Sequence, residues 1–460
     1  MPHPGSPRPS LSFPPVLRRV WIAIAALTVV SVLLSVGVHA AHGPNSFSLG
    51  ISPAGENFSD FTVYKFKFNY FHTPAFFQQG YPMTYPAPMA LIYRLFFLLG
   101  DSDLGVFLAV SVLSVLVPAF LFARALVRRG VHRSTAFAFS ATLLLCSWPA
   151  FVVIDRGNVE VFVWVTLAIG AWAFATGRNY TAAAFFALAA SLKLFPFVLL
   201  GLFVSARRWR PLLFGVAVFA AATVASLAIL GPTVATAYTG INGGLQFFHD
   251  TMMPFWRPWE SGVDHSLLAL FKFFAVIVFH YPVTTPFYAA ATFYTRLMAL
   301  VGIGLYVLLL RRLPLLNQLL AFSIICILFT PFSGDATLLH LYSAFALFCF
   351  LALDAHRRGL TVPGLSTALL LLAFITAYES FFVLPGFSFP VLGQSGPFTL
   401  SGQRFEGQAK CAALVWLLVV TLRYPFSSPL ARTPSASPLA EPDASQIETA
   451  QPAPAPEATL

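Results

Sequence analysis

The stretch that decides the fold is Leu104–Ala123, which reads LGVFLAVSVLSVLVPAFLFA and contains no charged residue. A helix needs about 20 apolar residues to cross the roughly 30 Å hydrocarbon core of a bilayer. The chain therefore contains at least one segment suited to span a membrane. Comparable uncharged runs lie at residues 20–38, 134–154, 211–230, 313–334, 336–353 and 359–378, and shorter or charge-bearing candidates lie at 158–176, 289–310 and 410–422.

The composition agrees with this pattern. Of the 460 residues, 58% are hydrophobic and only 10% are charged, and the mean hydropathy is +0.77. Soluble domains carry about 25% charged residues, so an ordinary soluble globule is excluded. The sequence predicts an all-α, polytopic integral membrane protein. Its four cysteines all lie within apolar runs, which indicates small core residues and neither a disulfide framework nor a metal site.

The two ends of the chain have a different composition. Residues 1–16 include six prolines, and 24 of the 36 residues in 425–460 are Pro, Ala, Ser or Thr. Such segments bury too little apolar surface to fold, so both are predicted to be solvated tails on either side of a membrane domain at residues 17–424. The run at 20–38 is interpreted as a retained helix, because signal-peptide cores are usually shorter.

The formal net charge of +10 would favour nucleic acid as the partner of a soluble protein, but here membrane topology explains it. Basic residues beside membrane spans stay in the cytoplasm during insertion. This rule predicts cytoplasmic termini, and the charge gives no reason to expect a nucleic-acid partner. The basic clusters are Arg18–Arg19, Arg124 with Arg128, Arg129 and Arg133, Arg207 with Arg208 and Arg210, Arg311–Arg312, Arg357–Arg358, and Arg423.

The same rule settles the ambiguous segments. Arginines flank residues 180–205 on both sides, so this stretch is predicted to be a hairpin of two short helices that turns near Lys193–Pro196. Helices at 86–99 and 266–280 are predicted to lie in the outer interface. The total is about 12 transmembrane helices, and segments 39–103, 231–288 and 385–409 face outward.

The first outer loop, residues 39–103, is rich in aromatic residues. From Phe58 to Tyr85, 11 of 28 residues are Phe or Tyr, which suits the membrane interface. Their spacing fits a helix lying on the membrane, although alternation from Tyr64 to Tyr70 leaves a strand open. Asp60 begins this stretch. A carboxylate among rings at the boundary can act as a general base, and the competing interpretation is a helix N-cap. Glu56, Asp101 and Asp103 are rival acids.

A second polar cluster, Asp155–Glu160, is placed by topology at the outer end of two adjoining spans. Ionisable groups beside a span tend to be functional. Arg156 can bind a phosphate bidentately, and Asn158 with Glu160 can hold a polar ligand. An internal Asp155–Arg156 ion pair remains an equal alternative.

Lys193 stands alone in the apolar hairpin. It needs either a lipid-linked phosphate as its partner or a path along which it reaches the headgroups. Both interpretations stay open at this point.

Other outward polar residues are weaker candidates. Tyr85 and His265 are possible substrate contacts, and His340 follows the Ser333–Asp335 loop, although a histidine on an apolar span is usually a core residue. Further outward candidates are His249–Asp250 and Trp256–Trp259. Zinc-binding, Walker A, dinucleotide and nucleophile-elbow motifs are absent from the sequence.

With these motifs placed, the chain resembles the type C glycosyltransferases and, within them, glycosyltransferase family 87, which includes mycobacterial polyprenyl-phosphate-mannose-dependent mannosyltransferases. The resemblance runs from about Val20 to Arg423. It departs from the mycobacterial pattern at Gly334–Thr337, where a Trp and a His pair are expected. The motifs that carry it are Asp60–Phe61, Tyr85–Pro88, Arg156–Asn158, Ala190–Pro196 and Pro331–Ser333.

The resemblance implies a type C fold and an inverting transfer of a hexose, with mannose as the expected sugar. The donor would be a polyprenyl-phosphate sugar, and the acceptor would be a lipid or an envelope glycan on the outer face of a bacterial inner membrane. Asp60 would take the acceptor proton, and Arg156 and Lys193 would lie near the donor phosphate. No metal or other cofactor is expected, since basic side chains can stabilise the leaving phosphate.

The rival from another class is a secondary transporter, with Arg156, Glu160 and Lys193 lining a substrate path. Transporters are commonly built from repeated halves around a midplane site. This sequence shows no repeat, gathers its polar residues toward one face and carries a 65-residue loop there, which favours an enzyme.

The charge pattern makes a topological prediction. In a variant lacking the native cysteines, single cysteines at positions 45 and 395 should react with an impermeant thiol reagent added outside sealed cells. Cysteines at 130 and 209 should not, because they lie in arginine-rich loops. Labelling at 130 or 209 from outside would reverse the assigned orientation.

Overall fold

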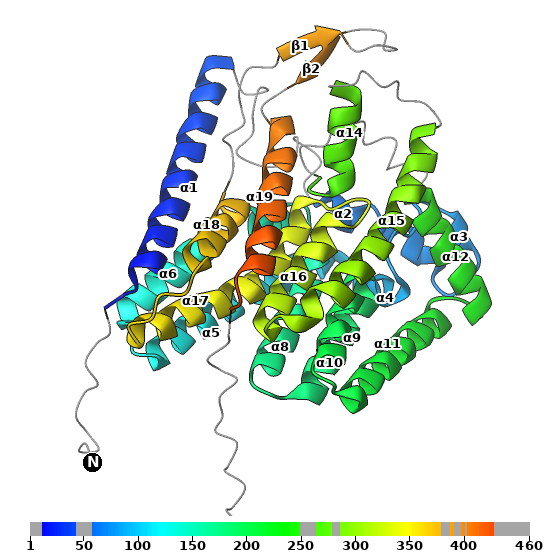
Figure 1. Cartoon of the computed structure of the whole chain (residues 1–460). Coiled ribbons are helices and arrows are strands. Elements are labelled where there is room, and N and C mark those ends of the chain that lie inside the picture. The colour runs from blue at the N-terminus through cyan, green and yellow to red at the C-terminus, as the bar shows by residue number, and fades with distance from the viewer. Residues whose placement is uncertain are drawn as a thin grey trace, which may run out of the picture.

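The computed structural model describes residues 12–42, 58–248, 264–277, 286–378, 387–390, 397–400 and 403–426. These residues are helical apart from the short antiparallel pair β1–β2 and connecting turns (Figure 1). The described elements in chain order are α1 (Pro15–His42), α2 (Ser59–Thr62), η1 (Lys65–Tyr70), α3 (Ala75–Gln78), α4 (Ala87–Phe97), η2 (Gly100–Ser102), α5 (Asp103–Arg128), α6 (Arg133–Leu145), α7 (Trp148–Asp155), α8 (Glu160–Ala175), α9 (Asn179–Leu192), η3 (Phe195–Leu200), α10 (Gly201–Ser205), α11 (Trp209–Leu230), α12 (Val234–Phe247), α14 (Leu267–Ile277), α15 (Pro286–Leu308), η6 (Leu310–Arg312), α16 (Leu315–Leu328), η7 (Asp335–His340), α17 (Leu341–Arg357), α18 (Leu365–Thr376), β1 (Phe387–Pro390), β2 (Pro397–Leu400) and α19 (Gln403–Arg423).

Several helices have the length and apolarity of membrane spans, so the chain is a helical membrane protein. Within the described ranges, five stretches of at least 18 residues qualify, and six further apolar helices are shorter. The start of α1 and the end of α19 are both the lower ends of these helices in the view of Figure 1. The long stretches are Pro15–Leu34, Gly100–Arg128, Trp209–Leu230, Phe293–Arg312 and Asp335–Arg357.

Helix boundaries follow the apolar runs with local exceptions. Helix α1 begins at Pro15, two residues inside the predicted N-terminal tail. The run at 134–154 is divided, because α6 ends at Leu145 and α7 begins at Trp148. The Ser147 side chain caps α7 by accepting a hydrogen bond from the backbone N–H of Ala150 at 3.1 Å. The predicted break in the 180–205 hairpin is present, with α9 ending at Leu192 and η3 starting at Phe195.

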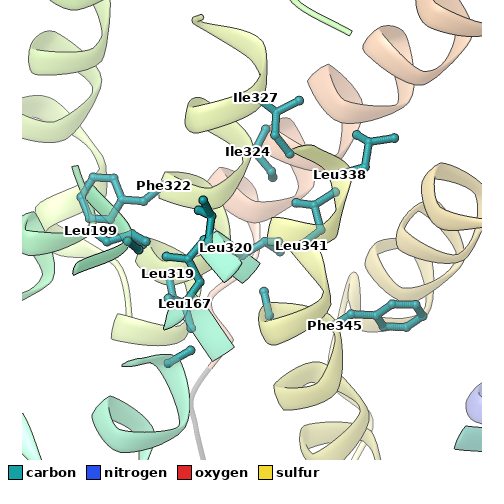
Figure 2. Close-up of a cluster of buried hydrophobic side chains, with 14 of the residues drawn as sticks. Leu167, Leu199, Leu319, Leu320, Phe322, Ile324, Ile327, Leu338, Leu341 and Phe345 are labelled. Carbon is teal, nitrogen blue, oxygen red and sulfur yellow. The ribbon is translucent and has the colours of Figure 1, made fainter. Parts of the chain in front are cut away.

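The apolar core gathers around α16. Every residue of this helix from Leu316 to Leu328 is buried, as expected for a helix that is apolar all round. Figure 2 shows Leu319, Leu320 and Ile324 of α16 among side chains from α8, η3, η7 and α17. The middle of the molecule is therefore a packed helical core, and the lipid-facing helices surround it.

The first outer loop is helical where the structure describes it, so the strand alternative for residues 64–70 is wrong. Phe61, Tyr64 and Phe68 are buried inside the protein and do not lie flat on a membrane. The Phe61 ring packs 4.7 Å from Phe97 of α4 and 4.5 Å from Phe107 of α5. These aromatic contacts fix α2 against two apolar helices.

A buried charge network joins the segment just before α14 to η7 and α19. His265 Nε2 lies 2.7 Å from Asp335 Oδ1, and Lys410 Nζ lies 3.5 Å from the same oxygen. Lys410 Nζ also lies 3.0 Å from Glu406 Oε1. The Lys410 side chain is fully buried. A buried charge is tolerated only when partners compensate it, so this network fastens the last helix to the core.

Replacement of Lys410 by Met should therefore destabilise the protein. The variant keeps most of the side-chain volume but leaves Asp335 and Glu406 without their shared cation, and breaking a buried pair costs about 3–5 kcal/mol. Thermal unfolding in detergent should show a clear fall in the unfolding temperature. Arg423→Met, which removes an exposed charge at the end of the same helix, is the control and should have little effect. Equal effects of the two changes would contradict a fastening role for Lys410.

Candidate active site

The first outer loop is joined to the turn between α7 and α8 by backbone hydrogen bonds. The N–H of Phe58 donates to the carbonyl of Asp155 at 2.9 Å, and the N–H of Asp60 donates to the carbonyl of Arg156 at 3.1 Å. Gly157 has a φ of +63°, and a Cβ there would lie 3.0 Å from Cβ of Phe61. Glycine is needed at this position because it permits both the positive φ and the close approach of the two segments.

The Asp60 carboxylate is held by two side chains from this turn. Arg156 donates from Nη2 to Oδ1 at 2.7 Å and from Nε to Oδ2 at 3.1 Å, and Asn158 Nδ2 donates to Oδ2 at 2.8 Å. A carboxylate has about four lone-pair sites, so these three bonds leave one position on Oδ1. The Asp60 side chain is 20% exposed, so an incoming hydroxyl group can reach this position.

This geometry bears on two sequence-based interpretations. Asp60 does not cap a helix: α2 begins at Ser59, and its N-terminus has no side-chain cap. The N-cap interpretation is therefore wrong. Arg156 makes its bidentate pair with Asp60 across the structure, whereas the sequence suggested either a donor phosphate or the neighbouring Asp155 as its partner.

Asn158 connects this pair to a second charged cluster. Its Oδ1 accepts a hydrogen bond from the backbone N–H of Glu160 at 2.8 Å, which orients the first residue of α8. Glu160 Oε1 lies 2.9 Å from Lys193 Nζ and 2.8 Å from His340 Nε2. Glu160 and His340 are each 3% exposed, whereas Lys193 is 23% exposed. Lys193 is the accessible member of the cluster.

Tyrosines line the neighbourhood of Asp60. The Tyr93 hydroxyl donates to the backbone carbonyl of Asp60 at 2.9 Å, and the ring of Tyr85 lies 5.9 Å from that of Tyr64. Burial raises the pKa of the Tyr85 phenol well above its ordinary value, and the charge of Asp60 raises it further. Tyr85 therefore stays protonated at neutral pH and remains a neutral hydrogen-bond donor.

The remaining candidates fall into three groups. His265 lies in the separate network with Asp335 and Lys410. Asp103 is paired with Lys65, whose Nζ lies 2.7 Å from Oδ2, and Asp101 lies in η2. The candidates outside the described residues are Glu56, His249, Asp250, Trp256, Arg257 and Trp259.

Sequence reasoning missed which partners meet. It proposed Glu160, Lys193 and His340 separately, and the structure brings Lys193 and His340 together at the carboxylate of Glu160. It also missed Lys410 as the shared partner of Asp335 and Glu406. The only sequence signal for such pairs is that ionisable residues in apolar surroundings need compensation, and this does not identify the partner.

Substitution of Gly157 by Ala should disturb the candidate site. A non-glycine residue in the left-handed region costs about 1–2 kcal/mol, and the added Cβ would also press against Phe61. Thermal unfolding should show a larger loss for Gly157→Ala than for Gly177→Ala. Gly177 is a matched control, because it has a φ of +79° but nothing within 4 Å of the added Cβ. Equal losses would mean that close packing at Gly157 is unimportant.

Comparisons with known proteins assign the family. The model of glycosyltransferase family 87 matches residues 83–333, more than half of the chain. This range includes Tyr85, Arg156, Lys193 and His265, while Asp60 lies before it. Comparisons with curated proteins and with solved structures return no match. On the strength of the family match, the chain belongs to glycosyltransferase family 87.

Proposed function

We propose that this membrane glycosyltransferase moves a hexose from a polyprenyl-phosphate donor to a lipid or envelope-glycan acceptor on the outer face of the bacterial inner membrane. Mannose is the expected sugar. Membership of family 87 supports the glycosyltransferase activity. The observation that carries the mechanism is the Asp60 carboxylate, which Arg156 and Asn158 orient while one position on Oδ1 stays open.

Asp60 acts as the general base in this proposal. An acceptor hydroxyl donates a hydrogen bond to Oδ1, and its oxygen attacks the anomeric carbon from the face opposite the phosphate. The new carbon–oxygen bond forms as the bond from that carbon to the phosphate oxygen breaks, so the anomeric configuration inverts. The acceptor proton passes to Asp60, and the electron pair of the broken bond leaves with the polyprenyl phosphate.

Lys193 stabilises the departing phosphate. An ammonium group has three donors, and the contact with Glu160 uses one of them. Because Lys193 is the exposed member of its cluster, its remaining donors are available to a phosphate oxygen. Glu160 holds the ammonium in place and also contacts His340, and Arg156 adds positive charge to the site beside Asp60.

The proposed architecture is a type C fold with about twelve crossings. Support comes from the apolar helices and from the reversal between α9 and η3, which divides residues 180–205 into two short helical arms. In this orientation the arginine clusters face the cytoplasm.

Asp60→Asn should abolish most turnover. The amide cannot take the acceptor proton, and losing general-base assistance costs about 10²- to 10⁴-fold in rate. The measurement is sugar transfer from a defined polyprenyl-phosphate-mannose donor by purified protein in proteoliposomes, together with donor binding, which should stay near the wild-type level.

The matched control is Asp103→Asn, which changes another carboxylate paired with a basic residue near the first outer loop. It should retain most activity. Near wild-type transfer by Asp60→Asn would exclude Asp60 as the base, and loss of activity only in Asp103→Asn would give that role to Asp103.

Lys193→Met should weaken donor binding about 10- to 100-fold, because a hydrogen bond to a charged group contributes about 1.5–3 kcal/mol. The binding of a radiolabelled polyprenyl-phosphate sugar to purified protein measures this. Lys65→Met removes the same charge near the first outer loop and should leave donor affinity unchanged. Unchanged affinity in Lys193→Met would return Lys193 to a structural partner of Glu160.

A further inference from the structure

A groove of about 420 Å³ lies between α5, α6, α8 and α17, and none of the charged residues of the proposed reaction centre lines it. Its lining is mainly aliphatic and aromatic, and includes Leu121, Ile169 and Trp172, which are 55%, 39% and 45% exposed. Such exposure of large apolar side chains in a membrane protein means that the groove opens sideways toward lipid. Its volume is within the roughly 300–1,000 Å³ range of ligand pockets.

Two arginines line one end of this groove. Arg124 and Arg128 lie on the last two turns of α5, and both are exposed. On α5 the lining extends from Pro118 to Arg128. Ten residues of helix rise about 15 Å, which is half of the roughly 30 Å hydrocarbon core. The groove therefore has the depth of one leaflet, with its positive charge at the end.

We propose that this groove binds an anionic phospholipid of the cytoplasmic leaflet, with an acyl chain between α5, α8 and α17 and the phosphate at Arg124 and Arg128. Basic pockets between membrane helices on the cytoplasmic side bind anionic headgroups. The orientation comes from the arginine clusters, so the inference does not depend on the transfer reaction.

The polyprenyl chain of the donor is the main competing occupant. Trp164, one turn after Glu160, lines the other end of the groove, so a hydrocarbon chain could reach it from the candidate site. However, a polyprenyl chain carries no charge to meet Arg124 and Arg128. The charge at this end favours a lipid whose phosphate lies there.

The test is native mass spectrometry of the full-length protein in detergent with added dioleoylphosphatidylglycerol or dioleoylphosphatidylcholine. The wild type should retain the anionic lipid preferentially. Arg124→Gln/Arg128→Gln should bind it about 30-fold more weakly, since each basic residue near an anionic lipid contributes about 1 kcal/mol. Arg311→Gln/Arg312→Gln removes two exposed arginines from another predicted cytoplasmic loop and should leave binding unchanged.

A second variant tests the groove itself. Ala346 lines the groove and is half-buried, so Ala346→Phe should fill it and reduce retention of the anionic lipid while all the arginines remain. Equal losses in the two arginine variants would indicate general surface attraction and overturn the proposal. Unchanged binding of the anionic lipid in Arg124→Gln/Arg128→Gln would also overturn the proposal. So would a competition experiment in which polyprenyl phosphate displaces the anionic lipid from the wild type but not from Ala346→Phe.

Discussion

The ion pair between Asp60 and Arg156 is the constraint on which the candidate site depends. Its two residues are 96 positions apart, and the pair is only partly exposed. Removing either partner would leave a charge in poorly hydrated surroundings, so the pair strongly favours one docking position of α2 on the α7–α8 turn. Gly157 allows the backbones to come close enough for this contact. Electrostatics and close packing thus select the same arrangement.

The pair also organises the second cluster. Asn158 donates to Asp60 and accepts from the backbone of Glu160, so the carboxylate in the outer loop and the first residue of α8 share one side chain. Glu160 in turn contacts Lys193 and His340. Every basic group in this chain of contacts has a carboxylate beside it. Groups held in this way need little reorganisation when a ligand binds.

The bilayer explains the distribution of the rest of the apolar surface. Of the 18 most apolar consecutive residues in the stretch Phe293–Arg312, only 11% are buried inside the protein. The corresponding buried share in Asp335–Arg357 is 83%. The first stretch lies at the surface of the protein and the second lies in its core, although their mean hydropathy is equal. Composition therefore identifies both as apolar helices but does not distinguish a lipid-facing helix from a central one, because lipid and protein interior are similarly apolar.

The sequence by itself determined the helical membrane class, most apolar helices, the break before Pro196 and the polar cluster at 155–160 as a candidate site, because these follow from local hydropathy, proline geometry and isolated charges. Only the tertiary structure decided three sets of ion pairs. Arg156 pairs with Asp60, Glu160 contacts both Lys193 and His340, and Lys410 pairs with Asp335. Local pattern indicates that a buried charge needs a partner. Which partner it finds depends on how helices far apart in the sequence pack together, and that is a property of the whole fold.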